Sequence, residues 1–142
     1  MKILIKNIGL MQDGKVTEHK NIAVEDKYIK EFPENPKEEE YDEIIEGHDM
    51  LAMPGLVNTH THVAMTLFRS YADDMALMDW LQNKIWPAED HLDDNIVYWG
   101  STLAFAEMIR GGTTAFCDMY MFMDACAKAA DKAGIRGNLA RG

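Results

Sequence analysis

The sequence lacks the features that mark secreted, membrane-spanning and nucleic-acid-binding proteins. Its 142 residues include only two cysteines, too few for a disulfide framework. It has no run of about 18 apolar residues that could cross a membrane, and the apolar run at its N-terminus is too short for a signal peptide. With 24 acidic residues against 14 basic ones, the net charge of −10 argues against nucleic-acid binding, which normally needs a basic patch. We therefore expect a cytoplasmic protein with reduced thiols.

What the sequence does contain is a pair of histidines at the end of a short apolar run, in residues 54–62. After a Pro-Gly turn, Leu56 and Val57 are typical of a buried strand. Residues two apart in a strand point to the same side, so His60 and His62 would face one point. Neutral imidazole is the commonest protein ligand for zinc, but a catalytic zinc needs about three protein ligands plus water. The pair predicts part of a metal site; the alternative is a polar pair on the surface.

The first part of the chain, residues 1–52, has the pattern of a small antiparallel β-meander. An Asp-Gly pair at 13–14 favours a hairpin turn, and the segment at 33–46 is acidic enough to predict a solvated loop rather than a docking surface. Three short strands would give a weak core on their own. The predicted strands cover residues 2–10, 21–24 and 27–32.

The second part, residues 53–142, alternates strand and helix patterns and therefore predicts a parallel α/β sheet with right-handed crossovers. An apolar stripe on the longest predicted helix indicates core packing. Asp118 closes a strand, where we expect a structural hydrogen bond, and Cys117 is expected to be a small buried residue. The predicted helices are 76–85 (ended by Pro87), 93–110 and 124–133, the later strands are 113–118 and 135–140, and the stripe is Ile96, Trp99, Leu103, Ala106 and Ile109.

The histidine motif at 54–62 resembles the first barrel strand of the amidohydrolase superfamily. Blocks at 65–69, 72–74, 77–81 and 85–89 are similar to the 5-methylthioadenosine/S-adenosylhomocysteine deaminases. The resemblance covers the whole chain but only about the first third of a family member. It implies that residues 53–142 form the first three or so βα units of a (β/α)8 TIM-type barrel. It also implies that residues 1–52 form half of a β-sandwich.

The same resemblance implies a function and a set of site residues. The expected reaction is metal-dependent hydrolytic deamination of adenosine-type nucleosides, with His60 and His62 binding a divalent metal, most readily Zn²⁺. Glu89 would accept hydrogen bonds from ribose hydroxyls, which suits a carboxylate. Trp80 would lie against the nucleoside, and Arg141 would pair with a substrate carboxylate. In the family, the remaining ligands and the proton-transfer groups come from later in the chain.

Two alternatives stay open on the sequence. The chain could belong to another amidohydrolase, of the guanine deaminase, cytosine deaminase or chlorohydrolase type. It could also be a non-catalytic fragment that associates with itself, because three parallel strands leave two open sheet edges. A closed barrel takes about 250 residues. We therefore expect the chain alone to be inactive and to need the missing C-terminal part of the same enzyme.

Overall fold

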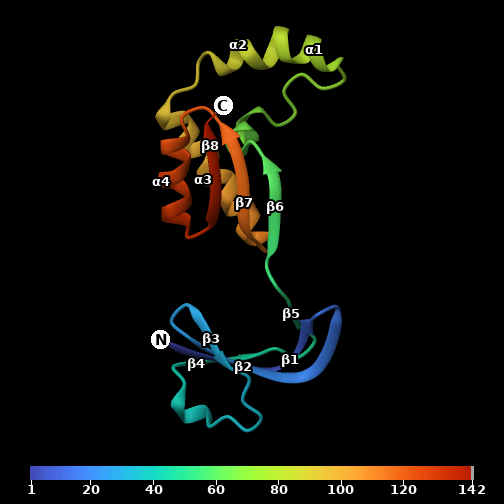
Figure 1. Ribbon diagram of the computed structural model, residues 1–142, viewed down its shortest axis with the longest axis vertical. Helices are drawn as coiled ribbons and strands as arrows, with labels where there is room; N and C mark the ends of the chain where they lie inside the picture. The colour runs from blue at the N-terminus through green and yellow to red at the C-terminus, as the bar shows by residue number, and fades with distance from the viewer. Residues whose placement is uncertain (142) are drawn as a thin grey trace. The chain divides into compact units, whose positions relative to one another are not determined.

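The computed structural model describes residues 1–141, which divide into two compact units, one of residues 1–54 and one that begins at Gly55 (Figure 1). Each unit is built around a sheet of its own, with the strand order β3 (Tyr28–Glu31), β2 (Lys15–Glu25), β1 (Lys2–Gln12), β4 (Glu43–Glu46) in the first and β6 (Leu56–Thr61), β7 (Thr113–Tyr120), β8 (Arg136–Arg141) in the second. No helix within the described residues is long and apolar enough to cross a membrane.

The first unit is a five-stranded sheet that contains the predicted meander. β1 pairs antiparallel with β2, and β2 pairs antiparallel with β3. The first turn uses Asp13 and Gly14, both with positive φ (50° and 73°), as an Asp-Gly turn allows. β4 and β5, however, pair with β1 in parallel, so the sheet is mixed rather than wholly antiparallel. Its strands are β1 (Lys2–Gln12), β2 (Lys15–Glu25), β3 (Tyr28–Glu31), β4 (Glu43–Glu46) and β5 (Leu51–Ala52).

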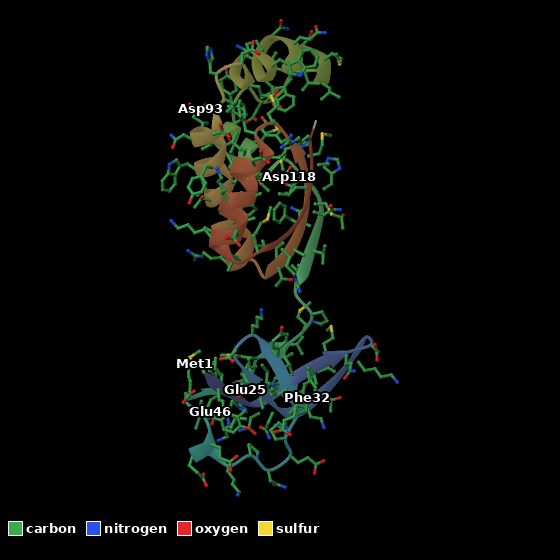
Figure 2. The ribbon with its side chains drawn as sticks, turned by 60° about the vertical axis from the view of Figure 1, so that its left-hand side comes forward. Met1, Glu25, Phe32, Glu46, Asp93 and Asp118 are labelled. Carbon is green, nitrogen blue, oxygen red and sulfur yellow. The ribbon has the colours of Figure 1, made fainter. Side chains whose placement is uncertain are left out.

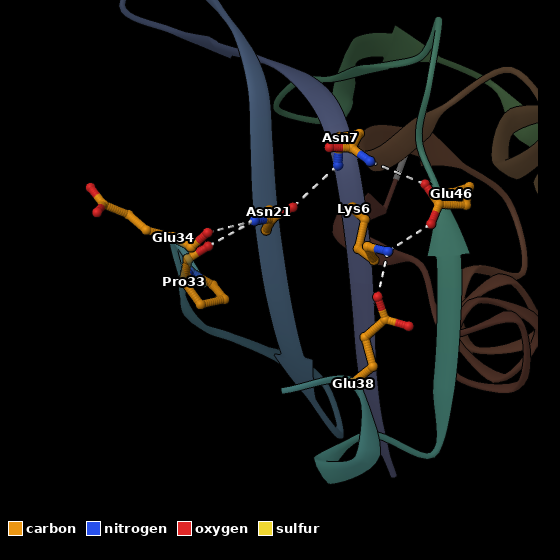
Figure 3. Close-up of polar contacts among 7 residues, drawn as sticks. All are labelled: Lys6, Asn7, Asn21, Pro33, Glu34, Glu38 and Glu46. Atoms are coloured by element: carbon orange, nitrogen blue, oxygen red, sulfur yellow. Dashed lines mark hydrogen bonds and ion pairs between the residues drawn. The ribbon is translucent and has the colours of Figure 1, made fainter. Parts of the chain in front are cut away.

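The parallel pairing of β4 follows from the long acidic connection before it, which carries the chain across the sheet and contains a short 3₁₀ turn, η1 (Glu38–Glu40). Figure 3 shows how polar contacts fasten this connection. The Lys6 ammonium lies 2.5 Å from Glu38 and 3.0 Å from Glu46. The amide of Asn21 donates to the carbonyl of Pro33 at 2.9 Å. These polar contacts hold the connection against the sheet. The buried apolar core of this unit is small and consists of Leu4, Ile8, Ile22 and Ala23.

The second unit is a three-stranded parallel sheet with two helices on one face, as the α/β prediction requires (Figure 1). β7 lies in the middle, and its side chains alternate between the helices and the open face. Phe116, Asp118 and Tyr120 are buried, whereas β6 and β8 contain no buried residue. The elements are β6 (Leu56–Thr61), α3 (Asp94–Arg110), β7 (Thr113–Tyr120), α4 (Met123–Ala133) and β8 (Arg136–Arg141).

The exposure of β6 contradicts the prediction of a buried strand. Leu56 and Val57 are 52% and 58% exposed. The reason is that β6 pairs only with β7 among the described strands, so its apolar side chains have no second neighbour. Cys117, expected to be buried, is only half-buried for a similar reason, because it lies on the open face of β7.

Helix α3 begins where the sequence predicts, with the Asp93 carboxylate accepting a hydrogen bond from the backbone N–H of Ile96 at 2.7 Å. Its predicted core stripe is wrong. Trp99, Leu103 and Ile109 are 58%, 46% and 49% exposed. The helix instead turns a face with several small residues inward, against the 3₁₀ segment η2 (Val63–Phe68), β7 and α4. The buried residues are Val97, Gly100, Ser101, Ala104 and Phe105.

The predicted helix before Pro87 also runs further than expected. Helical turns continue to Glu89 through α1 (Leu77–Trp80), a π-helical turn η3 (Leu81–Ile85) and α2 (Trp86–Glu89). Pro87 lacks an N–H and its ring crowds the carbonyl four residues earlier. The π-helical turn widens the backbone at that point, which lets the helix continue past Pro87.

Candidate metal and substrate site

The two histidines lie at the carboxyl end of β6, and their rings are close to each other. The ring centroids are 5.5 Å apart and the planes are 77° to each other. Two imidazoles bound at about 2.1 Å to one tetrahedral zinc would have centroids about 5 Å apart. The arrangement of His60 and His62 therefore fits two ligands of one metal ion, and their role as ligands remains a prediction.

A hydrogen bond made by the His62 ring leaves one ring nitrogen free to bind a metal. Its Nδ1 lies 2.6 Å from the carbonyl oxygen of Met119. A carbonyl can only accept, so Nδ1 carries the proton and Nε2 keeps its lone pair. Metal-binding histidines characteristically donate their second ring N–H in this way. The sheet thus fixes the tautomer that a zinc ligand needs.

Asp118, on the neighbouring strand β7 and labelled in Figure 2, is buried, and it lies beside His62. Its Oδ2 accepts from the backbone N–H of Val63 at 3.3 Å, which confirms the predicted structural hydrogen bond. Its Oδ1 has no partner within residues 1–141 and lies 3.9 Å from His62 Nδ1. Burial raises the pKa of the Asp118 carboxyl above its ordinary value. The residue therefore supports the start of η2 and also borders the histidines.

An open hollow joins these groups at the carboxyl ends of the three strands, the edge where catalytic groups of α/β barrels lie. Within residues 1–141, no group of three or more potential metal ligands comes together. The two histidines would thus need ligands from outside this part of the chain. The hollow is lined by Thr59, His60, Thr61, His62, Cys117, Asp118, Met119, Asn138 and Ala140.

Glu89 is held at the same end of the sheet by a residue that sequence reasoning missed. The Tyr120 hydroxyl donates to Glu89 Oε1 at 2.6 Å. The Tyr120 ring also lies beside His62, with centroids 5.8 Å apart. Burial, followed by the contact with Glu89, raises the pKa of the Tyr120 phenol above its ordinary value. The predicted substrate carboxylate and the predicted metal ligand are therefore neighbours of one tyrosine.

None of the three predicted substrate residues, Glu89, Trp80 and Arg141, lines the hollow. The Trp80 indole N–H donates to the carbonyl of Tyr71 at 3.3 Å, and Trp80 is half-buried in the connection between β6 and α3. Arg141 Nη2 lies 3.0 Å from both carboxylate oxygens of Asp124. Arg141 lines a second shallow pocket that Tyr120 also borders. Neither side chain has a described contact with His60 or His62, and their substrate roles stay predictions.

Comparison with known proteins adds a family and a set of relatives. Residues 51–142 match the amidohydrolase family. A 5-methylthioadenosine/S-adenosylhomocysteine deaminase from Dictyoglomus turgidum is 52% identical over 142 residues, which are 100% of this chain and 33% of the relative. A 5′-deoxyadenosine deaminase from Methanocaldococcus jannaschii is 52% identical over 99% of this chain and 32% of its own length. The chain thus spans about a third of these curated relatives.

Solved structures agree with the fold. An adenosine deaminase from Xanthomonas campestris with bound zinc has a TM-score of 0.86 and 37% identity, over 95% of this chain and 32% of that protein. An atrazine chlorohydrolase from Arthrobacter aurescens has a TM-score of 0.84 at 22% identity, over 98% of this chain and 35% of that protein. The second likeness is one of fold alone.

Proposed function

This chain belongs to the amidohydrolase family, and on that premise we propose that the protein carries out hydrolytic deamination of adenosine-type nucleosides. The substrates would include 5′-methylthioadenosine and S-adenosylhomocysteine, and the products an inosine-type nucleoside and ammonia. The names of relatives about 50% identical across the chain support this reaction. The observation that carries the proposal is the meeting of two imidazoles and an anchored carboxylate at one end of a parallel sheet.

His60 and His62 would hold a divalent metal, with zinc favoured by their nitrogen donors and by the zinc in the 37% identical adenosine deaminase. A bound divalent metal supplies Lewis acidity, which lowers the pKa of water toward neutrality. The contribution of this chain is to fix the donor atoms. The Met119 carbonyl keeps the His62 proton on Nδ1, and β6 keeps both rings within reach of one point. The remaining ligands and the proton-transfer groups would come from outside residues 1–141.

Glu89, Trp80 and Arg141 would bind the nucleoside. Glu89 Oε1 is engaged by Tyr120, and the other oxygen can accept from ribose hydroxyls. The ring of Trp80 can stack on a purine. Arg141 could pair with the amino-acid carboxylate of S-adenosylhomocysteine, which would have to displace Asp124.

The two free cysteines, Cys117 and Cys126, support a cytoplasmic location.

The test is deaminase activity of the protein expressed from its complete reading frame and loaded with zinc. Ammonia release from 5′-methylthioadenosine should be readily measured, and His60→Ala should lower kcat/KM by at least about a hundredfold, because it removes a metal ligand and with it the activation of water. His91→Ala, an exposed histidine on the same unit, is the matched control and should retain activity. A His60→Ala enzyme as active as the control would contradict the proposed function.

A further inference from the structure

The sequence pattern assigns no function to Tyr120, yet its side chain lies next to both the predicted substrate carboxylate Glu89 and the predicted metal ligand His62. Its hydroxyl donates to Glu89 Oε1 at 2.6 Å, and its ring lies 5.8 Å from that of His62. Resting on the proposed function, we propose that Tyr120 is a positioning residue for nucleoside binding. It holds the Glu89 carboxylate so that one oxygen faces the ribose hydroxyls, in fixed relation to the histidines.

The tyrosine itself is rigidly placed. It is 8% exposed and ends the central strand β7, whose buried face also contains Phe116 and Asp118. β7 pairs on both sides, with β6 and with β8. A buried tyrosine hydroxyl needs a partner, and a carboxylate, which can only accept, is a strong one. The hydroxyl therefore has one strongly preferred direction, toward Glu89.

Glu89, by contrast, is poorly fixed without Tyr120. It ends the short helix α2, which follows the π-helical turn and has no buried residue. Its carboxylate has no other hydrogen-bond partner within residues 1–141 than the Tyr120 hydroxyl. A glutamate side chain has several rotatable bonds, and ordering it costs conformational entropy. The hydrogen bond settles that ordering before the substrate arrives, which is the general way in which preorganisation improves binding.

The hydrogen bond from Tyr120 to Glu89 Oε1 also determines which substrate groups the Glu89 carboxylate can bind. The Tyr120 hydroxyl uses one lone pair of Oε1, which leaves both lone pairs of Oε2 to accept from the vicinal ribose hydroxyls. Tyr120 would therefore matter for substrates that carry those hydroxyls and not for analogues that lack them. A purely structural role, in which the hydroxyl only fastens α2 to β7, would instead affect all substrates alike.

The experiment uses the zinc-loaded protein expressed from its complete reading frame, with 5′-methylthioadenosine and its 2′,3′-dideoxy analogue as substrates. Tyr120→Phe should raise KM for 5′-methylthioadenosine about tenfold and change kcat by less than about threefold, since a hydrogen bond to a charged group is lost. KM for the dideoxy analogue should stay within about twofold. In a Glu89→Ala background, Tyr120→Phe should add nothing further.

Tyr98→Phe is the matched control, because its ring is half-buried on α3 and its hydroxyl has no described hydrogen bond within residues 1–141. An equal loss on both substrates, or no loss with Tyr120→Phe, would overturn the inference while the activity of the unmodified enzyme stands. A folded, zinc-loaded enzyme that deaminates neither substrate would overturn the proposed function, and the inference with it.

Discussion

Two neighbouring strands, β6 and β7, lie in opposite environments. On β7, Phe116 is 1% exposed and packs against Phe105 of α3. On β6, Leu56 and Val57 are more than half exposed. The difference lies in the neighbours: β7 has a strand on each side and a helix face against it, whereas β6 has one partner strand among residues 1–141. The buried strand therefore provides the rigid support, and the exposed one leads into the two histidines at its carboxyl end.

This comparison bears on how the site works. The groups that orient others, Asp118 and Tyr120, come from the buried strand. The groups predicted to touch metal come from the exposed edge, and no third ligand joins them within residues 1–141. The described residues thus contain the groups that orient the site and two of the predicted metal ligands.

The largest effect that we expect to distinguish β7 from β6 is on the free energy of unfolding. Phe116→Ala should lower the free energy of unfolding by about 3–5 kcal/mol, because it leaves a cavity under α3. Leu56→Ala should cost less than about 1 kcal/mol, because that side chain is 52% exposed. Urea denaturation of the chain, followed by circular dichroism, measures both. Equal losses for the two variants would show that β6 is as buried as β7.

A smaller effect is expected at the buried carboxylate. Asp118→Ala should lower the free energy of unfolding by about 1–3 kcal/mol, because the backbone N–H of Val63 loses its acceptor. Asp73→Ala, in an exposed loop, is the control and should change stability by less than about 0.5 kcal/mol. If the two variants unfold at the same urea concentration, Asp118 does not support η2.

Much of this fold was predictable from local patterns. The β-meander, the alternation of strand and helix after residue 53, and the start of α3 after its cap Asp93 all depend on turn, periodicity and capping signals within a few residues. The errors arose where distant neighbours decide. The inward face of α3 is set by close packing on η2, where a Cβ at Gly100 would come within 2.9 Å of the Ala64 carbonyl. Hydrophobicity alone favoured the Trp99 face instead.

The site divides in the same way. His60 and His62 could be singled out because they lie two residues apart at the end of one strand, His60 within β6 and His62 directly after it, a spacing that is visible in the sequence. Tyr120 could not, because an aromatic residue at the end of a strand is typical of a core. Its partner Glu89 lies 31 residues away, and only the fold brings them to 2.6 Å. The sequence signal that points to Tyr120 is the two-residue spacing of Phe116, Asp118 and Tyr120, which places the three on one face of a strand.

The most direct measurement is a crystal structure of the zinc-loaded protein, expressed from its complete reading frame, with anomalous data at the zinc edge. The predicted result is a zinc peak about 2.0–2.1 Å from Nε2 of both His60 and His62, with His62 Nδ1 still donating to Met119. Zinc bound elsewhere, with both imidazoles free, would contradict the account.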